Sequence, residues 1–226
     1  GSNNNLFKNN TFNSTSILSL EINDSDDINL TGNMIFRNAS IYNSDDLIFN
    51  ELNNVGGSLE VSSSNNLFVD SNVIGEFIIT TTTSSNVTNN TLDQLNVNTF
   101  TSGRINSNTV VNQNDTGFNL SGVSSSSIFS NDIQNTTLAI ILRSSSNTNT
   151  IYDNWIKDNA IGLNITSSTG NSIYNNYFSN TKNVDDDGSN TWNTDYSCNI
   201  PNIVGGPCKG GNFYSNYYGL DNGASS

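Results

Sequence analysis

The chain has 226 residues, of which 12% are charged and 33% are hydrophobic, and it carries a net charge of −13 at pH 7. Its seven lysine and arginine residues are too few to neutralise the phosphates of a nucleic acid, so we expect no nucleic-acid partner. No apolar run approaches the roughly 20 residues that span a bilayer, so we expect no membrane insertion by this part of the protein.

The chain starts with Gly1-Ser2, which has the composition of an expression-tag remnant, and then enters asparagine-rich sequence without a capping element. We therefore expect residues 1–2 to be a remnant and the rest to be a fragment of a longer surface protein. Residues 3–180 are expected to form one repeat array. Residues 181–226 are expected to form a last coil with a closing segment rich in glycine and aromatic residues.

One template recurs in the repeat array: an apolar residue, two polar residues, asparagine, any residue and a second apolar residue. Asparagine tolerates the left-handed backbone of a tight bend, and its amide both donates and accepts hydrogen bonds. We therefore predict a coil corner at each asparagine, with the side chains stacked in a ladder. These asparagines, spaced 17 to 23 residues apart, are Asn10, Asn33, Asn50, Asn72, Asn90, Asn108, Asn131, Asn154 and Asn176.

The apolar residues alternate with a period of two, which predicts strands. Leu138, Ile140 and Leu142 recur 23 residues later in the apolar positions of residues 161–165. A helical period is absent, and leucine-rich horseshoes of similar period have a leucine-dense signature that this chain lacks. We predict an all-β, right-handed parallel β-helix: a single-stranded solenoid of about nine or more coils of 17–23 residues.

Two cysteines, Cys198 and Cys208, lie in a segment rich in glycine, proline and asparagine. A short-loop disulfide forms readily there in an oxidising compartment, and we predict one. Free thiols are the alternative, and a two-cysteine metal site without any histidine is disfavoured.

Three stretches of the closing segment carry a family resemblance. Residues 190–193 read Asn-Thr-Trp-Asn, residues 202–207 read Asn-Ile-Val-Gly-Gly-Pro, and residues 210–219 read Gly-Gly-Asn-Phe-Tyr-Ser-Asn-Tyr-Tyr-Gly. With the repeats, they resemble archaeal surface proteins with parallel β-helix (PbH1-type) repeats, similar to the periplasmic copper-binding NosD-like β-helix family. Where that family typically has tyrosine and tryptophan, this chain has Phe213 and Tyr214. The resemblance covers nearly the whole chain and implies a right-handed β-helix, an extracellular or cell-surface location, and kinship with carbohydrate-binding proteins and sugar hydrolases.

We expect no cofactor. Copper sites draw on histidine, cysteine and methionine, and the chain has no histidine, one methionine (Met34) and two cysteines expected to be paired. Asp185 and Asp187 alternate before Gly188 as in a calcium loop, but the closing bidentate glutamate is lacking, so a polar loop is the preferred reading and calcium the alternative.

Two sets of side chains are candidates for chemistry. Asp132, Asp153 and Asp158 lie in adjacent coils, and a hydrolase needs paired carboxylates, but solvated acids at turns explain them better. We therefore expect no catalytic residue. If the protein is an enzyme, these three aspartates are the candidate catalytic residues. Exposed rings are a frequent means of holding sugars, so the candidate carbohydrate-binding residues are the four that flank two successive corners: Tyr152, Trp155, Tyr174 and Tyr177. The alternative is that these rings only shield the ladder.

The sequence is compatible with three functions. The favoured one is a non-catalytic, adhesin-like extracellular module that scaffolds or binds carbohydrate. The others are a carbohydrate-active hydrolase or lyase on the same fold, and a structural subunit of a surface layer or filament. An ice-binding face would need a flatter threonine lattice than this chain offers. The expected partners are a cell-surface or environmental polysaccharide, or neighbouring surface proteins.

Overall fold

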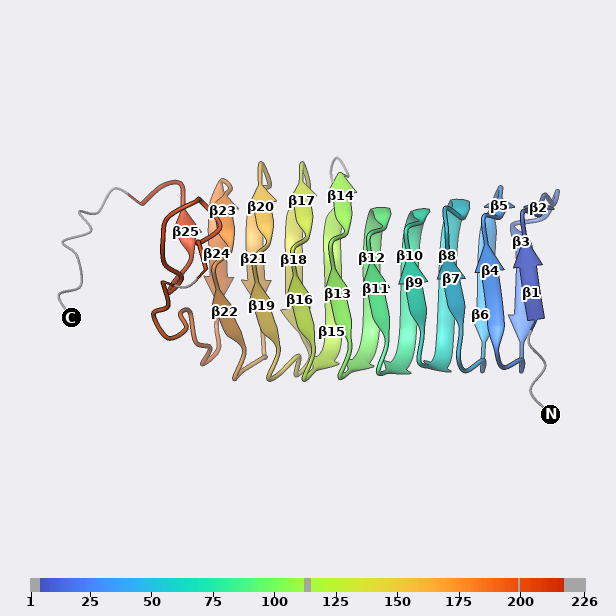
Figure 1. The fold of residues 1–226 in the computed structure, drawn as a ribbon, viewed down its shortest axis with the longest axis horizontal. Coiled ribbons are helices and arrows are strands. Elements are labelled where there is room, and N and C mark those ends of the chain that lie inside the picture. The colour runs from blue at the N-terminus through green and yellow to red at the C-terminus, as the bar shows by residue number, and fades with distance from the viewer. Residues whose placement is uncertain (1–4, 112–114, 199, 218–226) are drawn as a thin grey trace.

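The computed structural model describes residues 5–111, 115–198 and 200–217. Within these ranges the chain forms 25 β-strands and no helix. The strands wind into an elongated parallel β-solenoid whose coils follow one another in chain order along the long axis (Figure 1). The predicted all-β, parallel solenoid is thereby confirmed. The expected remnant, residues 1–2, and the end of the closing segment, residues 218–226, lie outside the described residues.

Each full coil contributes strands to three faces. The first face is a nine-stranded sheet of short strands that pair in parallel. Its members in stacking order are β1 (Asn5–Lys8), β4 (Ile28–Thr31), β7 (Ile48–Asn50), β9 (Phe68–Asp70), β11 (Asn86–Thr88), β13 (Arg104–Asn106), β16 (Ser127–Phe129), β19 (Thr150–Tyr152) and β22 (Ser172–Tyr174).

The second and third faces merge into one sheet because three long strands, β8, β10 and β12, run across both. The second face comprises β2 (Thr11–Phe12), β5 (Met34–Ile35), β8 (Asn54–Asn65), β10 (Val73–Thr83), β12 (Thr91–Thr101), β14 (Thr109–Val111), β17 (Asp132–Gln134), β20 (Trp155–Lys157), β23 (Tyr177–Ser179) and β25 (Phe213–Tyr214). The third face adds β3 (Leu18–Asn23), β6 (Asn38–Tyr42), β15 (Thr116–Ser124), β18 (Leu138–Arg143), β21 (Ile161–Ile165) and β24 (Lys182–Asp186). Stacking therefore continues beyond residue 180, through β24 and β25.

The core is a set of inward-facing apolar columns that run along the axis. Phe49 pairs with Leu30 on one side and Val69 on the other, and all three are fully buried. On the third face Ile140 pairs with Leu163, as the 23-residue repeat predicts. Full burial of each such side chain contributes about 1.5–3 kcal/mol to folding, so the stack gains stability coil by coil.

The asparagine ladder lies at the corner between the first and second faces. Asn154 is fully buried, and its amide nitrogen donates to Asn176 Oδ1 at 2.8 Å and to the Ile128 carbonyl at 2.9 Å. Its Oδ1 in turn accepts from the Asn131 side chain at 2.9 Å. The left-handed conformation falls on the residue before the ladder asparagine, such as Asp153 with φ 57°, and not on the asparagine itself as predicted. The asparagine is therefore selected by its amide, not by its backbone.

The ladder does not pass through Asn50. It passes through Asn53, which is fully buried, accepts from the Asn33 backbone at 2.7 Å and donates to Asn72 Oδ1 at 3.0 Å. The turn after the inward residue Phe49 is one residue longer than in the other coils. The template of fixed spacing therefore matched Leu47 and Asn50 instead of Phe49 and Asn53. The prediction of Asn50 as a ladder residue was therefore wrong, while stacking along this corner is confirmed.

The other two corners carry shorter amide ladders that the template did not find. Asn149 donates to Asn171 Oδ1 at 3.0 Å, and Asn171 donates to Asn190 Oδ1 at the same distance. At the third corner Asn159 donates to Asn180 Oδ1 at 2.8 Å. In the C-terminal coils, buried amides therefore satisfy the turning backbone at every corner.

Candidate functional site

A column of aromatic rings lies on the outer surface of the first face, next to the asparagine ladder. Phe129, Tyr152 and Tyr174 occupy the same register position in β16, β19 and β22. Their ring centroids are 4.9 and 5.4 Å apart, and successive ring planes are within 10° of parallel. Successive coils thus place one ring upon the next along the axis.

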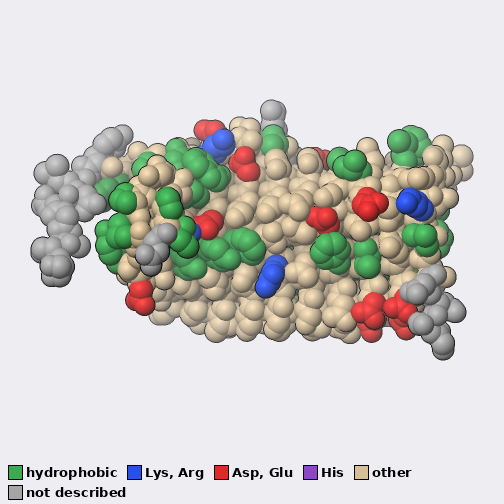
Figure 2. Space-filling view, viewed as in Figure 1, with side chains coloured by type: hydrophobic (Ala, Val, Ile, Leu, Met, Phe, Trp, Pro, Cys, Tyr) green, Lys and Arg blue, Asp and Glu red, His purple; other side chains and the backbone are tan. Residues whose placement is uncertain are grey.

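A second column lies across the same corner, on the outer surface of the second face. Trp155, Tyr177 and Phe213 pair in β20, β23 and β25, with centroids 4.5 and 4.9 Å apart. Trp155 is 40% exposed and Phe213 38% exposed, which is unusual for rings of this size. We call the two columns and the corner between them the aromatic corner. Figure 2 shows hydrophobic side chains gathered over these C-terminal coils.

All four predicted sugar-binding candidates lie in the aromatic corner, and two further rings join them. Phe129 lies 23 residues before Tyr152, one coil earlier, so the repeat itself could have identified it. Phe213 lies 36 residues after Tyr177, beyond the regular period, because the closing segment intervenes. Asn212 extends the asparagine ladder, because its Oδ1 accepts a hydrogen bond from the Asn176 side chain at 2.9 Å. Phe213 directly follows this asparagine, as Trp155 and Tyr177 follow theirs, and this was the sequence feature that could have identified it.

The stacking decides which parts of the rings are accessible. Within a column each flat face lies against the next ring, so ring edges and the phenol groups of Tyr152 and Tyr174 point outward. Phe213 ends its column, and its second face has no aromatic partner among the described residues. The aromatic corner therefore offers phenol groups at its edges, and the last ring of each column, Tyr174 or Phe213, has one face without an aromatic partner among the described residues.

Two phenols in the aromatic corner have perturbed acidity. Burial raises the pKa of the Tyr152 hydroxyl above its ordinary value of 10.0; Tyr174 and the Asp153 carboxylate raise it further, while Arg104 opposes them. Burial also raises the pKa of Tyr174, again with help from Asp153. Both phenols are therefore neutral hydrogen-bond donors well above neutral pH.

We expect Tyr152 and Tyr174 to ionise at a higher pH than free tyrosine when each is followed by tyrosine-labelled NMR across an alkaline titration. Because the folded pKa is raised, the unfolded chain ionises first. The contribution of these phenols to stability is thus complete below about pH 10 and is lost as the pH rises through the folded value. Asp153→Asn should lower the pKa of both phenols. Ionisation of Tyr152 and Tyr174 at the pH of free tyrosine would contradict this arrangement.

The segment between β24 and β25, described over residues 187–198 and 200–212, forms a cap at the C-terminal end of the aromatic corner. Cys198 and Cys208 form a disulfide within it, as predicted. Lys209 Nζ lies 3.2 Å from Asp153 Oδ1, with both side chains mostly buried, and so ties the cap to the corner. Asn175 donates to Asp153 and accepts from the Ile203 backbone at 2.9 Å. A pocket of about 360 Å³ lies between cap and corner, and Tyr196, Val204 and Phe213 are among its lining residues.

The three aspartates considered for catalysis occupy different places. Asp153 lies in the corner turn and is held by Lys209 and Asn175. Asp132 begins β17, directly beside Trp155 in the stack, and its Oδ1 is buried without a hydrogen-bond partner among the described residues. Asp158 lies in the turn after β20, at the far end of that strand.

The carboxylates considered for calcium are directed to separate protein partners. Asp185 forms an ion pair with Lys182 at 2.8 Å, and Asp187 accepts from the Ser167 backbone at 2.9 Å. Asp186, between them, binds the Trp192 indole at 3.1 Å. In the described ranges no three histidine, cysteine or acidic side chains come together as a metal site.

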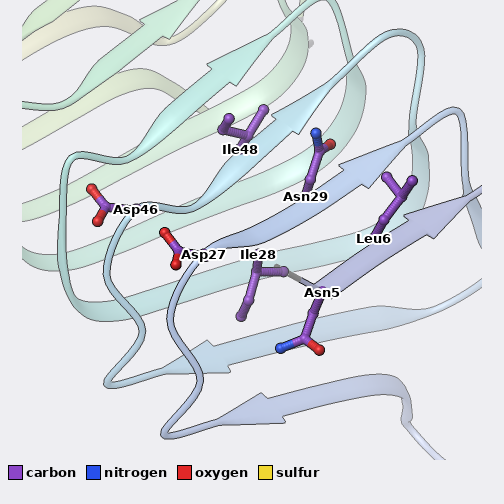
Figure 3. Close-up of a pocket in the computed structure, with 7 residues that line it drawn as sticks. All are labelled: Asn5, Leu6, Asp27, Ile28, Asn29, Asp46 and Ile48. Atoms are coloured by element: carbon purple, nitrogen blue, oxygen red, sulfur yellow. The ribbon is translucent and has the colours of Figure 1, made fainter. Parts of the chain in front are cut away.

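A second pocket, of about 340 Å³, lies near the N-terminal end between the first three strands of the first face (Figure 3). Asp27 and Asp46 from successive turns line it together with Leu6, Ile28 and Ile48. Among the described residues no aromatic ring lines it, in contrast to the pocket beneath the cap. Asp46 is already engaged, since it accepts from Asn66 at 2.9 Å.

The stacked three-faced coils and the disulfide-closed cap define a β-solenoid protein of an oxidising compartment. The family model described as periplasmic copper-binding protein (NosD) matches residues 41–219, and the chain belongs to this family. No curated protein matches the chain. The family and the disulfide agree with an extracellular or periplasmic location. None of the described residues forms a helix with the length and apolar character needed to cross a membrane.

The copper implied by the family description does not fit the donor groups of this chain. The sequence has no histidine, and both cysteines are consumed by the disulfide. The single methionine, Met34, lies on the exposed side of β5, far along the axis from the cap. Copper sites are built from imidazole, thiolate and thioether ligands, so the function of this chain must be sought elsewhere.

Proposed function

We propose that the chain is a non-catalytic, adhesin-like β-solenoid module of the cell exterior that binds carbohydrate at the aromatic corner. The observation that carries the proposal is the pair of outward aromatic columns, Phe129–Tyr152–Tyr174 and Trp155–Tyr177–Phe213, on either side of one corner. Exposed apolar patches bordered by polar groups mark interaction sites on soluble domains.

A sugar polymer suits this surface for two reasons. Its hydroxyl groups match the outward phenol edges of Tyr152 and Tyr174, and its apolar ring faces match the open face of Phe213 in the cap pocket. The rings recur on three successive coils, about 5 Å apart, so a ligand with a regular repeat can contact several coils at once. Such repeated weak contacts favour a polymer over a single sugar.

The carboxylates near the corner support binding without turnover. A glycosidase needs two carboxyl groups free to act as acid and as base or nucleophile. Asp153 is neutralised by Lys209, and Asp158 lies at the far end of β20. Of the three candidates, neither Asp153 nor Asp158 therefore provides a second free carboxylate beside Asp132.

The test is incubation of the purified protein with immobilised cell-wall and plant polysaccharides, with retained protein and released oligosaccharide read in the same experiment. We expect retention on at least one polymer and no released product. Trp155→Ala and Tyr152→Ala should each weaken retention roughly tenfold, the loss typical of a central aromatic contact. Phe68→Ala, which removes an exposed ring from the N-terminal half of the first face, is the control and should bind normally. Released oligosaccharides would overturn the non-catalytic assignment, and equal retention by all variants would overturn the site.

A further inference from the structure

A groove of about 400 Å³ lies on the outer surface of the third face, away from the aromatic corner. One side is formed by Ile78, Asn96 and Asn119, which stack in β10, β12 and β15. The other side is formed by the polar column Asn98, Ser121 and Arg143. The groove thus crosses three coil steps, or roughly 14 Å along the axis.

A chain of amides in the groove ends in an unused acceptor. Asn96 donates to Glu76 Oε1 at 2.7 Å, and Asn119 donates to Asn96 Oδ1 at 2.9 Å. Asn119 Oδ1 is then buried without a partner among the described residues. The next coil places Ile141 at this position, and an isoleucine side chain has no donor. A buried acceptor without a partner is unfavourable, so a small rotation of the half-buried Asn119 side chain that lets a ligand hydroxyl reach its Oδ1 would gain affinity.

The same groove contains a cation that has no carboxylate partner. Arg143 is exposed at the end of β18, and the ion pairs among the described residues, Lys182–Asp185 and Lys209–Asp153, do not involve it. Glu76, the carboxylate nearest the amide chain, is already bonded to Asn96. Arg143 is thus a cation without an ion-pair partner among the described residues, and it lies beside a polar groove. Its fork of donors suits a carboxylate.

We infer that this groove binds a carboxylate-bearing saccharide, with the carboxylate on Arg143 and a hydroxyl on Asn119 Oδ1. The amides and hydroxyl of Asn98, Asn119 and Ser121 recur at coil spacing, which suits a ligand with several hydroxyl groups more than a small carboxylic acid. The site lies on another face from the aromatic corner, so it does not depend on the function proposed above.

The test is calorimetric titration with trigalacturonate at low ionic strength, with fully methyl-esterified trigalacturonate as the neutral comparison. We expect the acid to bind and the ester to bind at least roughly tenfold more weakly, because the ester removes the charge-assisted hydrogen bond. Arg143→Gln should lower affinity for the acid by a similar factor, and Asn119→Leu should lower affinity for both ligands. Circular dichroism confirms that each variant is folded.

Arg104→Gln is the matched control, since it removes the same charge from an exposed site on the first face. It should leave binding of trigalacturonate within about twofold of the parent protein. The loss caused by Arg143→Gln should be the same when Trp155→Ala is also present, which separates this site from the aromatic corner. Equal binding of acid and ester, equal losses in Arg104→Gln and Arg143→Gln, or no binding of trigalacturonate would overturn the inference.

Discussion

Replacing Asn154 with alanine is expected to lower the free energy of unfolding by about 3–5 kcal/mol, the largest effect of any single substitution considered for this protein. The change removes the donors that reach Ile128, Tyr152 and Asn176, and it removes the acceptor of the Asn131 side chain and backbone. These groups stay buried, so each loses a partner without gaining water. Chemical unfolding followed by circular dichroism measures the loss.

Asn164→Ala is the control for the ladder. Asn164 lies on the outer surface of β21, where its side chain accepts a hydrogen bond from Thr166 at 2.9 Å. Its partner remains accessible to water, so we expect a change of less than about 0.5 kcal/mol. Comparable losses in the two variants would show that the ladder is no more important than a surface amide.

Gly103→Ala is expected to destabilise the solenoid by about 3 kcal/mol, at the upper end of what overpacking costs. A methyl group at this position would lie 2.5 Å from the Ser85 carbonyl oxygen and closer still to the ring of Phe100. Phe100 is fully buried, so its ring cannot move aside without opening the core. The midpoint of thermal unfolding should fall by roughly 6–12 °C.

Gly211→Ala is the matched control for Gly103. A methyl group there meets no atom within 4 Å, and the position is exposed in the cap. We expect its thermal midpoint to stay within about 2 °C of the parent protein. A midpoint for Gly103→Ala as high as that of Gly211→Ala would mean that the core adjusts at this corner more easily than its packing indicates.

The fold was predictable because each coil repeats the same physical solution. Inward positions such as Ile140 and Leu163 recur at one period, and buried asparagines mark one corner. The prediction failed at Asn50 because a single extra residue in this turn moves the ladder asparagine of this one coil out of the template's fixed spacing, and only the burial of Asn53 identifies the true ladder residue. The template requires the asparagine to lie three residues after the inward apolar residue, so it misses a coil in which this turn is one residue longer.

The candidate site was predictable in part for the same reason. Tyr152 and Tyr174 share a register position, so their stacking follows from the period. The pairing of Lys209 with Asp153 joins residues 56 positions apart through an irregular cap, and no period relates them. The unpaired acceptor of Asn119 was not predictable either. It depends on the direction in which each amide of the column donates its hydrogen bond, and the sequence does not specify that direction.

Fluorescence of Trp155 reports on carbohydrate binding at the aromatic corner, because this indole lies there and the chain has only one other tryptophan, Trp192. In a Trp192→Phe protein, the polysaccharide retained in the binding experiment should shift the emission of Trp155 saturably while no oligosaccharide is released. Retention of the protein without any change in this emission would show that the polysaccharide binds away from the aromatic corner.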